Sequence, residues 1–210
     1  LNDSEQRGAA LAQQIVPWAG ANGGKVNLVG HSQGSPTSRV AASLRPDLVA
    51  SVTSVNGVNK GSKVADVLRG VIPANSLIEG GVNALANALG AVINLLSGSS
   101  NPQSGIDALK TLTTAGTTAL NGRHPWGVNS SSYCAKSTEV HNVRGHNIRY
   151  FSWTGNTSYT NVFDAVDPFL AITGLAFGSE KNDGLVGVCS TYLGQVIGDG
   201  YNMNHVDAIN

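Results

Sequence analysis

Residues 30–34, Gly-His-Ser-Gln-Gly, constrain the fold of this chain more than any other segment. They follow a short apolar run at 26–29 that is typical of a buried strand, and they precede a segment with helical spacing that ends at Pro46. A Gly-x-Ser-x-Gly sequence between a strand and a helix is typical of a sharp turn that presents the serine oxygen to a substrate. Glycines suit both flanks of the serine, because the backbone crosses itself closely there and a Cβ would clash. The segment therefore predicts that Ser32 is a nucleophile.

The order of the predicted elements favours the α/β class. Helical spacing covers residues 3–18, the strand and helix on either side of Ser32 follow, and 49–55 is a second β-rich apolar run. A β-α-β order of this kind predicts a mostly parallel central sheet with helices on both faces. Further strands are expected at 148–153 and 192–197.

Composition narrows the functions that remain. The 210 residues suffice for one domain with a sizeable core. Lys plus Arg and Asp plus Glu number 13 each, so no nucleic-acid partner is expected. No apolar run reaches the roughly 18 residues that cross a bilayer, so no transmembrane segment is expected. The sequence shows no signal-peptide pattern and begins at Leu1, which suggests a processed or truncated product.

The two cysteines, Cys134 and Cys189, fit a single disulfide better than a zinc site, because no histidine stands at finger-like spacing. In the chain-entropy model such a bridge contributes about 4 kcal/mol of stability. It would also place the chain in an oxidising compartment, the periplasm or the cell exterior. The alternative is two buried, unpaired thiols of a cytosolic protein.

Apolar residues recur at three- and four-residue spacing over 77–96, which predicts a helix with a wide apolar face. The pattern alone favours a helix packed on the core. The alternative is a lid that covers the site around Ser32 and turns toward lipid when it opens.

A serine nucleophile needs a histidine that takes its proton and a carboxylate that orients the histidine. In proteins whose serine lies on this kind of turn, the catalytic residues follow along the chain in the order serine, acid, histidine. His205 follows the last predicted strand and is the preferred base, the alternative being an exposed loop histidine. His31 is expected to point away from the chemistry of Ser32, and the remaining histidines come too early in the chain.

Several aspartates satisfy the order required of the acid. We favour Asp183, because Gly184 frees the backbone beside it and a disulfide at Cys189 would brace its loop. The residues that qualify by order are Asp164, Asp167, Asp183 and Asp199, with Asp164 and Asp167 as the runners-up.

The chain resembles the secreted bacterial triacylglycerol lipases of the Pseudomonas/Burkholderia type. The resemblance runs from Leu1 to Asn210 and is carried by four segments: 26–34, 45–55, 182–186 (Asn-Asp-Gly-Leu-Val) and 203–207 (Met-Asn-His-Val-Asp). The last two are far more specific than the first. The resemblance implies the α/β-hydrolase fold, with Ser32 as nucleophile, Asp183 as acid and His205 as base.

The resemblance also implies a Cys134–Cys189 disulfide, a lid within 77–96, and a structural Ca²⁺ ion held by Asp164 and Asp207. Calcium prefers several oxygen ligands, so two carboxylates from distant loops would be cross-linked by it. Without the resemblance, both aspartates would be assigned to turn capping. The resemblance further implies secretion through the periplasm to the exterior, a dedicated lipase foldase, and an ester substrate at a water–lipid interface.

The implied reaction is hydrolysis of long-chain triacylglycerols through an acyl-enzyme. The N–H of Gln33 is expected to be one oxyanion donor. Two alternatives are a soluble carboxylesterase of the same fold and a catalytically silent chain that only binds lipid or a folding partner.

The chain departs from the family pattern in places. No segment resembles the loop that supplies the second oxyanion donor, only one predicted strand precedes Ser32, and the chain stops three residues after Asp207. We therefore expect residues 1–210 to form a single α/β-hydrolase domain that is incomplete at both ends. Ser35 stands where the family usually has glycine, and residues 56–61 replace a Gly-Ala-Pro-His-like turn.

Overall fold

The computed structural model describes residues 3–21, 23–70 and 109–209. The predicted lid segment, 77–96, lies outside the described residues. No described helix is long and apolar enough to cross a membrane. The described strands are β1 (Val26–His31), β2 (Val49–Val55), β3 (Val140–Val143), β4 (His146–Gly155) and β5 (Gln195–Tyr201). The described α-helices are α1 (Ser4–Ala21), α2 (Gly34–Leu44), α3 (Lys63–Leu68), α6 (Thr114–Arg123) and α7 (Asp167–Gly174).

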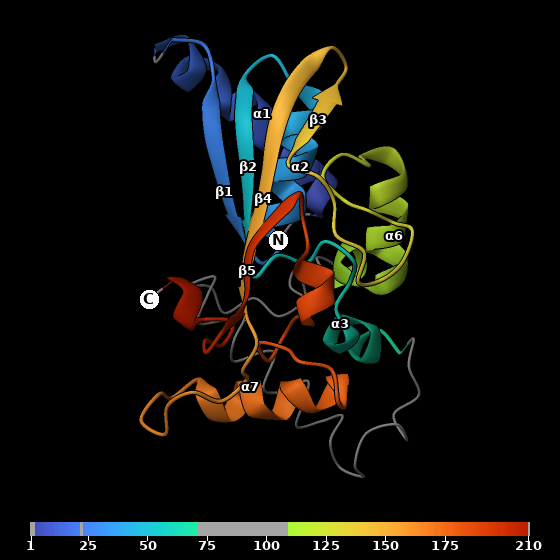
Figure 1. Ribbon diagram of the computed structural model, residues 1–210, viewed down its shortest axis with the longest axis vertical. Helices are drawn as coiled ribbons and strands as arrows, with labels where there is room; N and C mark the ends of the chain where they lie inside the picture. The colour runs from blue at the N-terminus through green and yellow to red at the C-terminus, as the bar shows by residue number, and fades with distance from the viewer. Residues whose placement is uncertain (1–2, 22, 71–108, 210) are drawn as a thin grey trace.

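The strands form one mixed, mostly parallel sheet in the order β1-β2-β4-β3, with β5 also paired to β4 (Figure 1). The pairs β1–β2, β2–β4 and β4–β5 are parallel, and only β3 runs antiparallel to its neighbour. β3 and β5 occupy successive stretches of the same edge of β4, at 146–149 and 151–155 respectively. The predicted α/β class and mostly parallel sheet are confirmed.

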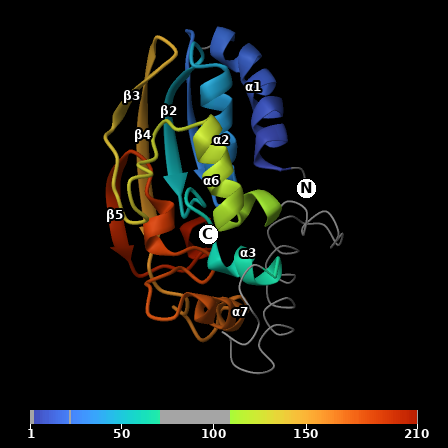
Figure 2. The same cartoon turned by 90° about the vertical axis from the view of Figure 1, so that its right-hand side faces the viewer.

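Two helices cover one face of this sheet. Leu28, Val52 and Tyr150 are neighbours across β1, β2 and β4, and they share a buried cluster with Ala12 of α1 and Ala41 of α2. Figure 2 shows α1 and α2 stacked on this side. Alternate side chains of a strand point to opposite faces of the sheet, so the helices on one face bury every second residue of each strand.

The opposite face differs from the predicted arrangement. Val29, Thr53 and Phe151 are neighbours on that face, and Val29 is 72% exposed. Within the described residues, helical cover of the central strands is therefore seen on one face, not on both.

The element boundaries show what the sequence pattern missed. β1 continues through Gly30 to His31, because both residues pair with β2 beyond the apolar run. Strand β3 was not predicted, since its four residues, Val-His-Asn-Val, offer only two apolar side chains. β5 begins at Gln195, three residues later than expected.

A disulfide joins Cys134 to Cys189, with an S–S distance of 2.04 Å, as the sequence predicts. Lys60 stabilises the loop that carries Cys134: its Nζ donates to the carbonyl oxygens of residues 132, 133 and 135 at 2.8–3.2 Å. Burial lowers the pKa of Lys60 to about 8. The bridge ties this loop to the 3₁₀ turn Val188–Thr191, which follows the segment containing Asp183.

Candidate active site

Ser32 lies on a strained turn between β1 and α2. Its φ is +53°, a left-handed conformation that is uncommon for residues other than glycine. A Cβ at Gly30 would lie 2.3 Å from the carbonyl oxygen of Gly34, so the turn requires glycine at position 30, as predicted. A Cβ at Gly34 would meet no described atom within 4 Å, so the prediction of a clash at that position is wrong. The difference arises because Gly34 already begins the helix.

Asp183 is fully buried in a tight turn that fixes its carboxylate. Its Oδ1 accepts from the backbone N–H groups of Leu185 at 3.0 Å and Val186 at 2.7 Å. Gly184 allows this turn, because its φ is +101° and a Cβ would lie 2.7 Å from Cβ of Leu170. With Oδ1 held by its own loop, Asp183 presents Oδ2 to another partner.

That partner is His205, which is also fully buried. Its Nδ1 donates to Oδ2 of Asp183 at 2.8 Å, and its backbone N–H donates to the carbonyl of Asp183 at 2.8 Å. The hydrogen on Nδ1 leaves a lone pair on Nε2 of the neutral ring. Within the described residues Nε2 has no hydrogen-bond partner. The ring is therefore oriented by Asp183 and able to accept a proton at Nε2.

His31, the residue directly before Ser32, contacts this pair. The ring centroids of His31 and His205 lie 4.6 Å apart, and Nε2 of His31 donates to the carbonyl of His205 at 2.7 Å. Burial, followed by the nearby His205, lowers the pKa of His31 to about 4. The expectation that His31 points away from the chemistry is wrong, because the adjacent chain of His205 offers an acceptor for its ring nitrogen.

The other candidate acids do not contact His205. Asp199 accepts from Nζ of Lys136 at 3.0 Å and from the hydroxyl of Tyr192 at 2.9 Å. Asp164 and Asp167 gather with Asp207 instead. Of the four aspartates that satisfy the chain order, Asp183 alone binds His205 in the described part of the structure.

The three carboxylates of Asp164, Asp167 and Asp207 offer oxygens within 4.8 Å of one another. Asp167 is fully buried, and its oxygens accept from the backbone of residues 160 and 161 and from the side chain of Asn204. Among the described residues, Asp164 and Asp207 each keep one carboxylate oxygen that accepts no hydrogen bond. This cluster could hold a metal ion, and one of its members, Asp207, is two residues after His205.

Two buried asparagines near His205 were not identified from the sequence. Asn204 accepts at Oδ1 from the N–H groups of Val206 and Asp207, which shapes the turn after His205. Asn56 follows β2 with φ +46° and contacts the same loop. Neither asparagine belongs to a periodic motif. The only sequence signal at Asn56 is the departure of its turn, residues 56–61, from the family pattern.

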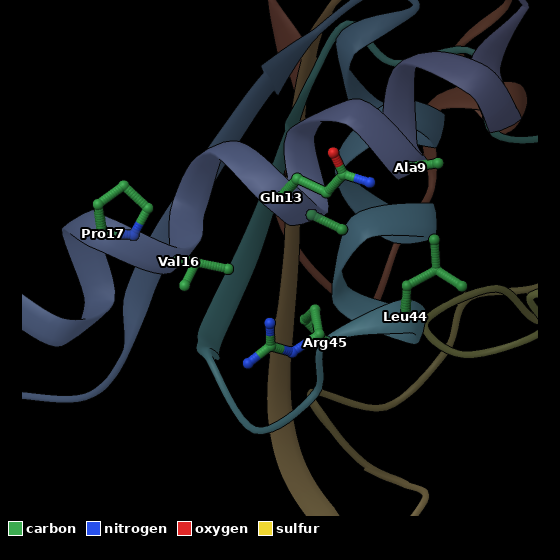
Figure 3. A pocket seen from close by; sticks show the side chains of 7 residues that line it. Ala9, Gln13, Val16, Pro17, Leu44 and Arg45 are labelled. Atoms are coloured by element: carbon green, nitrogen blue, oxygen red, sulfur yellow. The ribbon is translucent and has the colours of Figure 1, made fainter.

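A separate apolar groove of about 540 Å³ lies between α1 and the end of α2 (Figure 3). It is lined by Ala9, Ala12, Gln13, Val16, Pro17, Leu44 and Arg45. Leu44 is the last residue of α2, whereas Ser32 precedes its first turn. The groove therefore lies at the opposite end of the helix from Ser32.

The sheet, the turn at Ser32 and the order of Ser32, Asp183 and His205 along the chain define the α/β-hydrolase class. Residues 19–75 match the family model described as the alpha/beta hydrolase fold. The fold is similar to the crystal structures of Bacillus licheniformis lipase BlEst2 in mature form and of the metagenomic carboxyl esterase MGS0156. The matched regions cover 99% and 95% of this chain, respectively. They cover 69% and 51% of those chains, with TM-scores of 0.65 and 0.56 and identities of 20% and 22%. At these identities the likeness shows the fold alone.

Sequence relatives identify the family. The chain is 48% identical to a triacylglycerol lipase of Vibrio cholerae over its full length and 38% identical to a triacylglycerol lipase of Pseudomonas fragi. It spans 66% and 73% of these two proteins, respectively. The chain therefore belongs to the triacylglycerol lipase family.

Proposed function

We propose that this chain carries the ester-hydrolysing centre of a triacylglycerol lipase, with Ser32 as nucleophile, His205 as base and Asp183 as acid. The observation that carries the proposal is the fully buried hydrogen bond of 2.8 Å between Nδ1 of His205 and Oδ2 of Asp183. His31 supports it, because this neighbour of Ser32 binds the main chain of His205. A serine beside a histidine that a carboxylate orients is suited to acyl transfer.

In the proposed mechanism, Oγ of Ser32 attacks the ester carbonyl carbon while Nε2 of His205 takes the hydroxyl proton. Asp183 keeps its charge and stabilises the imidazolium. His205 then gives the proton to the departing alcohol, which leaves an acyl group on Ser32. Water, deprotonated at Nε2, attacks this acyl-enzyme, and the fatty acid departs as Ser32 recovers its proton.

The tetrahedral intermediate of each half-reaction carries an oxyanion. We assign one of its hydrogen-bond donors to the backbone N–H of Gln33, the first residue after the nucleophile. Such donors act where negative charge develops, and loss of one costs about 3–4 kcal/mol of transition-state stabilisation.

The proposed Ca²⁺ ion would bind Asp164 and Asp207. Both residues fit a hard cation, because each has a carboxylate oxygen without a described hydrogen-bond partner. Asp167 lies in the same cluster, but its hydrogen bonds already occupy both of its oxygens. Bound there, the ion would supply a structural cross-link between the loop before α7 and the loop of His205.

Exposed apolar side chains support action at a water–lipid interface. Phe163 is 94% exposed and Val162 67% exposed in the loop before α7, and Leu175 is 59% exposed directly after that helix. The Cys134–Cys189 disulfide supports secretion through the periplasm to the exterior. We extend the proposal to a lid within 77–96 and to a lipase foldase as a folding partner.

An active-site label tests the proposal. An alkyl phosphonate carrying a long acyl-like chain should form one adduct at Ser32, which mass spectrometry locates on the corresponding peptide. The Ser32→Ala variant is the matched control and should remain unmodified. A folded protein that stays unlabelled, or equal labelling of the Ser32→Ala variant, would contradict the proposal. Faster hydrolysis of dissolved short esters than of emulsified triacylglycerol would instead favour the carboxylesterase alternative.

A further inference from the structure

Asn56 lies between the central sheet and residues 203–207, the loop that carries His205 and is called the histidine loop below. It is fully buried and directly follows β2, and its backbone N–H donates to the carbonyl of Trp153 in β4 at 3.2 Å. Its φ of +46° is a conformation that glycine adopts freely and asparagine tolerates better than most residues. A glycine would satisfy the backbone here, so the presence of a buried amide side chain requires another explanation.

The side chain of Asn56 connects two segments that are far apart in the sequence. Its Oδ1 accepts from the N–H of Gly155 at the end of β4 at 3.0 Å. Its Nδ2 donates to the carbonyl of Asn204 at 3.2 Å, with a longer contact of 3.5 Å to the carbonyl of His205. The amide oxygen of Asn56 thus binds the sheet, and its nitrogen binds the main chain of the histidine loop.

Packing below the amide leaves this loop little room to move. A Cβ at Gly155 would lie 1.9 Å from the carbonyl oxygen of Met203, so the histidine loop lies directly on the end of β4. The peptide groups of His205 are then held from three sides: by the carbonyl of Asp183, by the ring of His31 and by the amide of Asn56. His31, the last residue of β1, links the loop to one strand of the sheet, and Asn56 links it to the end of another strand, β4, through Gly155.

We propose that Asn56 is a positioning residue: it fixes the position of His205 relative to Ser32 by tying the main chain at 204–205 to the end of β4. This inference rests on the proposed function of Ser32 and His205. The Asn56 side chain acts on the backbone, so it fixes where the imidazole stands and leaves its bond to Asp183 intact. Small displacements of this kind lower the rate of the chemical step more than they weaken substrate binding.

Two substitutions separate the contacts. Asn56→Gly keeps the left-handed backbone and removes all contacts of the amide. Asn56→Asp keeps the size and the acceptor for Gly155 but removes the N–H donor to the histidine loop, so the proposal stays testable if the glycine variant fails to fold. Asn59→Ala is the matched control: Asn59 is equally buried three residues later, and its side chain bonds Ser35, Ser54 and Thr191 instead of the histidine loop.

Steady-state hydrolysis of a dissolved p-nitrophenyl ester measures the effect, with the rate of phosphonate labelling at Ser32 as a second readout. We expect Asn56→Gly and Asn56→Asp to lower kcat and the labelling rate by about ten- to a hundredfold with little change in KM. Asn59→Ala should lose thermal stability but keep kcat within about threefold of the wild type, on the same reasoning. An inactive, unlabelled wild type overturns the proposed function. An active wild type whose Asn56 variants behave like Asn59→Ala overturns the positioning role alone.

Discussion

Single side chains in the candidate site take their roles from groups that lie far away in the sequence. His31 precedes Ser32, yet its ring nitrogen binds the carbonyl of His205, 174 positions later. The sequence motif identified Ser32 by its glycine spacing, whereas it contained no signal for the orientation of His31. A side chain's partner depends on which backbone groups the fold brings near it, and the local pattern does not contain that information.

His31 should make stability sensitive to mild acid. Its pKa is lowered to about 4 in the folded protein and is near 6.5 in the unfolded chain, so protons bind preferentially to the unfolded state between these values. Stability is therefore fully present above pH 6.5 and falls as the pH decreases toward 4. Because the ring is only partly buried, we expect a loss of about 1–2 kcal/mol from this group.

Urea unfolding of the wild type and of His31→Gln at pH 7 and pH 4.5 measures this loss. Glutamine keeps an N–H donor for the carbonyl of His205 but does not titrate in this range. The decrease in unfolding free energy between the two pH values should be smaller in the variant. An equal decrease in both proteins would show that other groups cause the acid sensitivity.

At the level of elements, the strand–turn–helix unit around Ser32 follows from its local sequence. β2 runs from Val49 to Val55, as the apolar run predicts, while β1 and α2 extend further toward the turn than their apolar patterns do. β3 escaped prediction because its pairing with β4 stabilises a short, polar segment. Strand pairing is a tertiary contact, so a strand with few apolar residues gives little sequence signal.

The two glycines of the turn should respond differently to substitution. Gly30→Ala places a Cβ 2.3 Å from backbone atoms of Gly34, so the turn must shift; we expect a loss of about 2 kcal/mol or more in stability and a strong loss of Ser32 labelling. Gly34→Ala, at a helical position with no described atom near the new methyl group, should fold and label like the wild type. Thermal unfolding and phosphonate labelling of both variants test this difference. Equal behaviour of the two variants would contradict the turn geometry.

The whole described structure brings three loops together around one end of the sheet. The turn at Ser32, the Asp183 loop and the loop at 204–207 meet through hydrogen bonds among buried and partly buried groups. The acidic cluster adds a fourth segment, the loop before α7 and the start of that helix. Hydrogen bonds through Asp167 and Asn204 already join this segment to the histidine loop, so a metal ion would reinforce a connection that the protein makes itself.

Calcium should accordingly stabilise the folded protein. Adding millimolar Ca²⁺ after treatment with EGTA is expected to raise Tm by several degrees, because an ion that binds only the native state shifts unfolding by mass action. The variants Asp164→Asn and Asp207→Asn should lose most of this shift. Asp199→Asn is the control, since Asp199 binds Lys136 and Tyr192 outside the cluster. An undiminished shift in the Asp207→Asn variant would place the ion elsewhere.

The sequence by itself determined the α/β class, the strand–turn–helix unit at Ser32 and an ordered set of candidates for acid and base, and it favoured a disulfide between the two cysteines. These features depend on local spacing, on chain order or on the small number of residues of one type. The sequence favoured Asp183 among four aspartates, and the structure shows that Asp183 faces His205. Only the tertiary structure decided that His31 and Asn56 hold the histidine loop, and that one face of the central strands lies open within the described residues. The contacts of Asp183, His31 and Asn56 depend on buried or partly buried hydrogen bonds between segments about 20 to 175 residues apart, whose geometry is set once the sheet has brought their backbones together.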